Sequence, residues 1–116
     1  MGDRGFDLDF SDGEFGEKLL SQILKGKIEV KTDERAFETK NVVVEFTYKG
    51  NDSGIRTTTA DWWSFVLSGS HKKEVIVMIK TSRLKELIAK NNYQTACGGD
   101  NYNSSMYKVP LKDLIS

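Results

Sequence analysis

Hydrophobic and polar residues alternate along two stretches of this chain, with the two-residue period of half-buried β-strands. In residues 27–33 the alternation places Ile28, Val30 and Thr32 on one face and four charged side chains on the other. Residues 42–49 show the same period. The two stretches lie close together in the sequence, so a short turn can join them. We therefore predict a β-hairpin whose turn lies within residues 37–41.

The rest of the chain divides into shorter elements, read from apolar spacing, capping residues and β-branched runs. In chain order we predict a helix over 14–24, the hairpin, a helix over 60–67, a turn at 68–73, a central strand over 74–80, a helix over 81–90, a strand over 106–109 and a helical turn at 111–115. Residues 1–12 are expected to be flexible and 91–105 to form a loop. The order α-β-β-α-β-α-β describes one α/β domain, 1–116, with a small mixed β-sheet flanked by helices.

Composition is that of an ordinary globular protein, and it excludes several classes. Of the 116 residues, 38% are hydrophobic and 29% are charged, which suits one core. No apolar run approaches the roughly 20 residues that span a bilayer. The acidic start lacks the apolar segment of a signal peptide, so we expect no membrane association. One cysteine and one histidine exclude an internal disulfide and a structural zinc site, and a reducing cytoplasm is the expected compartment.

Net charge is zero, but the charges are unevenly distributed. Residues 1–26 hold six acids and three bases, whereas residues 71–90 hold six bases and two acids. A basic surface can therefore accompany an acidic, metal-binding region. A guanidinium binds phosphate in a bidentate manner, and threonine hydroxyls and free amides at a helix start bind anions. The candidate phosphate-binding residues, which would contact DNA if DNA is the substrate, are Arg56, Thr58, Thr59, Lys80 and Arg83.

Two carboxylates stand within the predicted hairpin. Asp33 ends the first strand, and Glu45 lies in the middle of the Val-rich second strand, where a carboxylate is costly to bury unless it is paired or binds a cation. If the turn centres near Thr39, Asp33 faces Glu45, and directly opposed residues have Cβ atoms about 5 Å apart. Oxygen donors on adjoining strands predict a site for a hard divalent cation. The hairpin therefore indicates a metal-dependent hydrolase.

An acid on an opening helix, an Asp at the end of one strand and an acid within the next strand resemble the PD-(D/E)XK nuclease superfamily. Among its branches the chain looks most like small phage-type and Holliday-junction-resolving endonucleases, over residues 13–90. The resemblance implies a restriction-endonuclease-like fold and a Mg²⁺-dependent DNA endonuclease, in which Mn²⁺ can replace Mg²⁺, acting in phage or bacterial DNA replication, recombination or repair. It matches Asp33 to the first motif, Glu45 and Phe46 to the second, and Glu17, or alternatively Glu14, to the helix acid.

The resemblance further implies that Asp33, Glu45, the Phe46 backbone carbonyl and Glu17 hold the metal. The chain departs from the motif at Thr47, where a lysine is expected. Two lysines are candidates for its role: Lys31, which the predicted register places opposite Thr47, and Lys49, two positions beyond it on the same face. Because so small a chain cannot clamp a duplex alone, we expect a homodimer or a partner domain. The alternative is a non-catalytic module of the same fold that binds nucleic acid or protein and needs no metal.

Overall fold

The computed structural model describes residues 2–69 and 74–116, with side chains given from Asp12 onward. Its elements in chain order are α1 (Gly2–Lys25), β1 (Ile28–Asp33), α2 (Ala36–Thr39), β2 (Asn41–Tyr48), β3 (Asn51–Asp52), a 3-10 turn (Gly54–Arg56), β4 (Trp62–Leu67), β5 (Val75–Lys80), α3 (Thr81–Lys90), β6 (Thr95–Gly98), a second 3-10 turn (Asp100–Tyr102), β7 (Ser104–Pro110) and α4 (Leu111–Leu114). The predicted α/β class is confirmed, while the order of elements differs from the predicted one.

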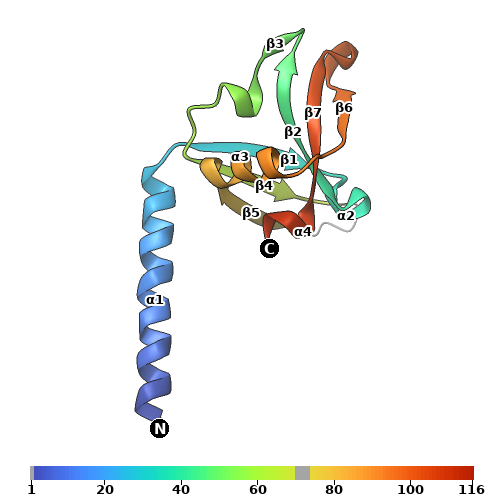
Figure 1. Cartoon of the computed structure of the whole chain (residues 1–116). Coiled ribbons are helices and arrows are strands. Elements are labelled where there is room, and N and C mark those ends of the chain that lie inside the picture. The colour runs from blue at the N-terminus through green and yellow to red at the C-terminus, as the bar shows by residue number, and fades with distance from the viewer. Residues whose placement is uncertain (1, 70–73) are drawn as a thin grey trace.

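The strands form two sheets. The first sheet has the order β1-β4-β5, and it is mixed because β1 runs parallel to β4 and β5 runs antiparallel to it. This is the small mixed sheet that the sequence predicts. The second sheet has the order β3-β2-β7-β6 and is antiparallel throughout. In Figure 1 the strands of the first sheet run across the view and those of the second sheet rise above them.

The core lies between the two sheets and α3. Apolar side chains from α2, β2, the first 3-10 turn, β4, β5, α3, β7 and α4 form this core or pack against it. Burial of each of the larger ones contributes about 1.5–3 kcal/mol of stability. The buried cluster consists of Ala36, Val42, Val44, Ile55, Trp63, Phe65, Leu67, Ile79, Leu84, Leu87 and Val109. The inward face of β4 therefore forms the centre of the molecule.

The predicted hairpin of residues 27–33 and 42–49 is wrong. Both segments are strands, but β1 pairs with β4, and β2 pairs with β3 and β7. Between them α2 buries Ala36 completely and ends at Lys40, a left-handed residue (φ 63°) whose N–H donates to the Ala36 carbonyl. This helical turn carries the chain from one sheet to the other, whereas a hairpin would have kept both strands in one sheet.

The predicted helix over 60–67 is also wrong, because Trp62–Leu67 forms β4. Its side chains alternate: Trp63, Phe65 and Leu67 enter the core, and the intervening residues face the other way. A strand between two others needs apolar groups on both faces, so its sequence is a continuous apolar run. Periodicity alone does not separate such a run from a buried helix. The strand predicted to be central, β5, lies at the edge of this sheet.

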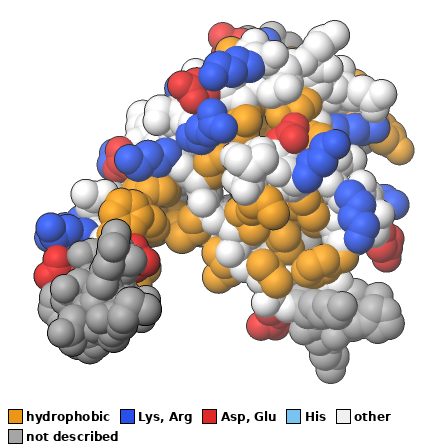
Figure 2. Space-filling view, turned by 60° about the horizontal axis from the view of Figure 1, so that its bottom comes forward, with side chains coloured by type: hydrophobic (Ala, Val, Ile, Leu, Met, Phe, Trp, Pro, Cys, Tyr) orange, Lys and Arg blue, Asp and Glu red, His pale blue; other side chains and the backbone are white. Residues whose placement is uncertain are grey.

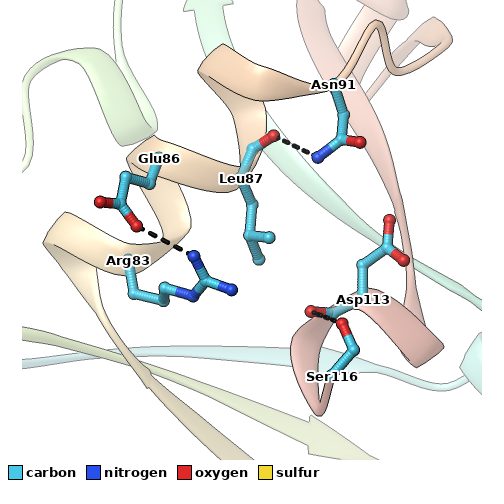
Figure 3. Close-up of polar contacts among 6 residues, drawn as sticks. All are labelled: Arg83, Glu86, Leu87, Asn91, Asp113 and Ser116. Carbon is cyan, nitrogen blue, oxygen red and sulfur yellow. Dashed lines mark hydrogen bonds and ion pairs between the residues drawn. The ribbon is translucent and has the colours of Figure 1, made fainter.

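The helix predicted over 81–90 is confirmed as α3, with Leu84 and Leu87 buried. The Asn91 side chain donates to the Leu87 carbonyl at 2.8 Å and closes its last turn (Figure 3). The strand and final helical turn near the C-terminus are also present, as β7 and α4. The predicted 91–105 loop contains β6 and a 3-10 turn. Residues 70–73 of the predicted turn, including the histidine, lie outside the described residues.

Helix α1 includes the helix predicted over 14–24 but begins at Gly2, within residues that the sequence suggests are flexible. It extends away from the sheets (Figure 1). The molecule consequently measures 60 × 33 × 25 Å, with a radius of gyration of 16.9 Å, whereas a compact domain of this length has about 13 Å. None of the described helices is both long and apolar enough to cross a membrane.

Candidate functional site

The polar side of β1 faces the interior of the molecule. Glu29, Lys31 and Asp33 are half-buried, whereas Ile28 and Val30 are exposed to solvent. The parallel register aligns the three charged residues with the core residues Trp63, Phe65 and Leu67 of β4. They therefore extend the buried face of β4 toward the edge of the sheet. Charged groups at such a position are costly unless a partner or a ligand compensates them, which marks this edge as a candidate site.

A pocket of about 140 Å³ lies at this edge. Asp33 and Lys31 reach it from β1 in the first sheet, and Glu45 reaches it from β2 in the second sheet. The complete lining is Lys31, Thr32, Asp33, Val43, Glu45, Phe65 and Met106. The structure thus brings together the two carboxylates and one of the two candidate lysines, although the hairpin that was expected to do so does not form.

Both carboxylates are held by hydrogen bonds. Asp33 Oδ1 accepts from the backbone N–H of Arg35 at 2.9 Å, which is the local turn that an Asp side chain favours. Glu45 Oε1 accepts from the hydroxyl of the buried Ser104 at 2.6 Å. These bonds occupy one oxygen of each group and fix its orientation. Preorganised carboxylates of this kind are what a cation site requires.

A β-bulge sets the position of Glu45. The register of β2 against β7 shifts between Glu45 and Thr47, which leaves Phe46 unpaired in the ladder. Gly54, at a positive φ of 53°, packs on the bulge so closely that a Cβ there would overlap the Glu45 carbonyl oxygen. The Phe46 carbonyl, which the resemblance assigns to the metal, accepts the Ser53 N–H at 3.0 Å. Its oxygen is therefore already engaged within the fold.

The structure separates the two candidate lysines. Lys31 lines the pocket, with its Nζ 3.8 Å from Glu29 Oε2 and 5.8 Å from the centre of the Trp63 ring. Lys49 lies beyond the end of β2 in a turn with a positive φ of 51°, and its Nζ stands 5.4 Å from the Tyr48 ring centre. It is not among the residues that line the pocket. Of the two candidate lysines, only Lys31 therefore lines the pocket that Asp33 and Glu45 share.

The predicted helix acid is not brought to the pocket. Glu17 and its alternative Glu14 are exposed on α1, which extends away from the sheets (Figure 1). Among the side chains that the structure describes, no group of three or more His, Cys, Asp or Glu residues could hold a metal ion. The candidate cation site therefore has two protein carboxylates, Asp33 and Glu45.

The predicted DNA contacts are scattered over the surface. Arg56 lines a different pocket, where its Nη1 lies 3.0 Å from Asp52 Oδ1 and its guanidinium 4.7 Å from the Phe46 ring centre. The hydrogen bond that Arg56 donates to the Asp52 carboxylate, and then its interaction with Tyr107, raise the pKa of Arg56. Arg83 is paired with Glu86 at 2.9 Å (Figure 3), and this bond lowers the Glu86 pKa.

The remaining predicted contacts also lie apart from the pocket. Lys80 lies on the outward face of the first sheet, with its Nζ 5.7 Å from the Trp62 ring centre. The Thr58 hydroxyl accepts the Ala60 N–H at 3.1 Å, and Thr59 is exposed. Because residues 62–67 form a strand, these two threonines do not begin a helix. The physical reason for expecting an anion there is therefore lost.

Sequence reasoning missed two basic residues beside the pocket. A larger hollow of about 620 Å³ shares Thr32, Asp33 and Val43 with it and adds Arg35 and Lys108. Arg35 follows Asp33 by two positions, so its closeness to the site could have been inferred from the sequence alone. Lys108 is aligned with Val43 in the β2–β7 register, so it could be found only from the strand pairing. Together they place two basic groups near the carboxylates, in a hollow that Glu34 also lines.

Comparison with protein-family models, with curated proteins and with solved structures finds no match to this chain. The fold and the site define its class: an α/β protein with two carboxylates and a lysine in one pocket at the junction of two sheets. Its function has to be inferred from that pocket.

Proposed function

We propose that this protein is a metal-dependent phosphodiester hydrolase that cuts DNA. The observation that supports this proposal is the shared pocket of Asp33, Glu45 and Lys31, with Arg35 and Lys108 in the hollow beside it. Two carboxylates, one lysine and two further basic side chains nearby are groups that hydrolysis of a phosphate ester can use. The resemblance of Asp33, Glu45 and Phe46 to PD-(D/E)XK motifs points to the same chemistry.

The residues fit Mg²⁺, which is commonly bound by one or two carboxylates while waters and substrate phosphates complete its shell. Asp33 and Glu45 would hold it, and Mn²⁺ would be accepted by the same oxygen donors. The bound ion would lower the pKa of a coordinated water and stabilise negative charge on the phosphate. Glu17 is not needed for this arrangement, and the Phe46 carbonyl is already hydrogen-bonded to Ser53.

Lys31 supplies the positive charge that Thr47 cannot. Lys31 lines the pocket together with Asp33. Its ammonium group, which pairs with Glu29 Oε2 at 3.8 Å in this structure, would turn toward the substrate to orient the attacking water and neutralise a phosphate oxygen. A positioned acid–base group of this kind contributes about 100-fold or more to a rate. Arg35 and Lys108 would hold the backbone phosphates on either side of the cut, and such contacts make binding weaker at high salt.

The relation to PD-(D/E)XK nucleases is proposed at the level of the site residues. A restriction-endonuclease-like core would place the two acidic strands side by side in one sheet, whereas β1 and β2 pair with other strands here. We further propose that the protein acts as a homodimer in cytoplasmic DNA replication, recombination or repair. Two sites in one dimer would suit a branched or double-stranded substrate.

A second candidate is a non-catalytic module that binds nucleic acid or protein. Two observations favour it: Thr47 replaces the motif lysine, and no third acid joins the pair among the described side chains. Such a module would not need a cation in the pocket. Divalent-metal affinity therefore separates the two candidates before any substrate is known.

The test is a calorimetric titration with Mn²⁺ and a cleavage assay with Mg²⁺ on supercoiled, linear and branched DNA. Asp33→Asn and Glu45→Gln keep the acceptor oxygens that Arg35 and Ser104 use but remove the charge, so the fold should persist. Each should lose Mn²⁺ binding and cleavage. Glu17→Gln, a carboxylate outside the pocket, is the matched control and should change neither. A wild-type protein that binds no Mn²⁺ would exclude the hydrolase and leave the binding module.

A further inference from the structure

The outward face of the first sheet is apolar and uncovered. The registers place Ile28 and Val30 of β1, Val66 of β4, and Ile76 and Met78 of β5 on this side, opposite the core; we call these five residues the open face. Val30 and Ile76 are 57% and 63% exposed. Figure 2 shows hydrophobic side chains gathered on the underside of the body, with Lys and Arg side chains along the border. A continuous apolar patch of this kind marks an interaction surface.

Helix α1 carries a second uncovered apolar surface. At 100° per residue, Phe15, Leu19, Leu20, Ile23 and Leu24 fall on one half of the helix. Ile23 is buried, but Phe15, Leu20 and Leu24 are exposed. The glycines on the same side, Gly13 and Gly16, would meet nothing within 4 Å if a Cβ were added. The chain thus presents an apolar helix face and an apolar sheet face, each without a partner among the described residues.

The helix is held away from its own open face. Lys27 donates its N–H to Asp61 Oδ2 at 2.9 Å, and its carbonyl accepts the N–H groups of Asp61 and Trp62 at 2.8 and 3.1 Å. Gly26 packs so tightly that an added Cβ would lie 3.1 Å from Asp61 Oδ2 and 3.3 Å from the Trp62 ring. These contacts fix the backbone directly after α1, and Ile23 near the end of the helix is buried in its present position. The geometry therefore favours a helix that comes from another molecule.

Length and charge fit the helix of a second copy. Residues 12–25 of α1 are about 21 Å long at 1.5 Å per residue, and the six-residue strands of the sheet are about 20 Å long. The helix carries acidic Asp12, Glu14 and Glu17, which form no ion pair within the described structure. Basic and acidic groups both border the hydrophobic patch in Figure 2, and the basic Lys80 stands over Trp62 on the side of the open face.

We propose that two copies of this chain associate reciprocally, with α1 of each covering the open face of the other. A two-fold axis makes every contact occur twice. Each copy then contributes both a helix face and a sheet face, which is how so small a chain can approach the roughly 800 Å² per partner of a stable interface. The inference rests on packing and charge alone, and it holds whether or not the pocket is catalytic.

The test uses two variants, one on each surface, at residues whose exposure means that folding does not depend on them. Leu24→Glu alters the helix face and Ile76→Lys alters the open face. The wild-type chain should have twice the monomer mass in sedimentation at micromolar concentration. Each variant should raise the dissociation constant by about 30-fold or more, as loss of an interface hot spot does. Tyr102→Glu, at an exposed aromatic on neither surface, is the matched control and should remain a dimer.

Mixing the two variants provides the decisive measurement. A mixed dimer has one unaltered contact, between the native helix of the Ile76→Lys copy and the native face of the Leu24→Glu copy. Its other contact sets a glutamate against a lysine. The mixture should therefore recover dimers that neither variant forms alone. A monomeric wild type, a dimer that both substitutions leave intact, or a mixture that stays monomeric would each overturn reciprocal exchange.

Discussion

The two faces of the first sheet differ most at β1, which is polar on the inner face and apolar on the outer face. On the inner face, β1 sets Glu29, Lys31 and Asp33 beside the core residues of β4. On the outer face it exposes Ile28 and Val30 to solvent. The strand is thus polar inside and apolar outside, the reverse of an ordinary half-buried strand. A sequence period of two tells which residues share a face, but the packing of neighbouring strands decides which face is inward.

The inward charged groups and the outward apolar groups of β1 each indicate a binding surface. On the inner face, Lys31 and Asp33 line a pocket, where under the proposed function a cation and a phosphate would compensate their charges. Apolar groups are tolerated outside if a second surface covers them. The contrast can therefore be tested from either side, by removing a charge from the inner face or by comparing apolar residues on the two faces.

The largest expected effect comes from the inner face. Asp33→Asn and Glu45→Gln should each reduce Mg²⁺-dependent cleavage by about 1,000-fold, the upper range for loss of one electrostatic stabiliser. Circular dichroism and the melting temperature should change little, because the hydrogen bonds to Arg35 and Ser104 can persist. A variant at wild-type speed would show that the inward charges of β1 and β2 are not a metal site.

The second effect is on stability and compares the faces within one strand. Ile79 is 6% exposed on the inner face of β5, and Ile76 is 63% exposed on the outer face. Ile79→Ala should cost about 2–5 kcal/mol, as truncation in a packed core does. Ile76→Ala should cost no more than about 0.5 kcal/mol in the dissociated monomer. Urea unfolding at low protein concentration measures both, and equal costs would mean that the outer face is covered within one chain.

The third effect distinguishes the lysines. Lys31→Ala should slow cleavage by about 100-fold, in the range of a positioned acid–base group, with little change in Mn²⁺ affinity. Lys49→Ala is the matched control, since this lysine lies in a turn outside the pocket, and its rate should equal that of the wild type. The opposite result would assign the role to Lys49 and place the reaction away from β1.

The smallest effect concerns the elements that cover the inner face. Tyr93, just after α3, donates to Asp113 Oδ2 of α4 at 2.8 Å. Burial, and then this bond, raise the Tyr93 pKa to about 12. Because the unfolded pKa is about 10, the stabilisation is complete below pH 10 and is lost as the pH rises through 12. Tyr93→Phe should cost about 1 kcal/mol at neutral pH and remove this alkaline dependence, as unfolding curves across that range would show.

Much of the local structure could be predicted from the sequence. The helix over 81–90 has capping residues and inward leucines at helical spacing, and the strands at 27–33 and 42–49 have a clear period of two. The sequence wrongly predicts a helix at Trp62–Leu67, because a strand buried on both faces shows no period of two. The β1–β4 pairing could not be predicted, since it joins residues far apart and no local turn signals it.

In the candidate site, too, the residues within local patterns could be predicted, whereas those that depend on long-range packing could not. Asp33, Lys31 and Glu45 were selected as carboxylates and a cation within strand patterns, and the structure brings them to one pocket by a route through two sheets. Arg35 and Lys108 were missed because their approach to Asp33 depends on α2 and on the β2–β7 register. Glu17 was selected for its helical spacing, which does not reveal where a projecting helix points.

The parallel pairing of β1 with β4 has a consequence for the order of folding. Lys27 is joined to Asp61, 34 residues later, and closing a loop of that length costs about 3 kcal/mol of chain entropy. The antiparallel β4–β5 pair begins with Leu67 and Val75, whose shorter loop costs about 2 kcal/mol on the same scale. We expect β1 to dock last, onto a preformed β4–β5 pair. Asp33 and Lys31 would then reach Glu45 only in the final step, so partly folded chains would carry no assembled pocket.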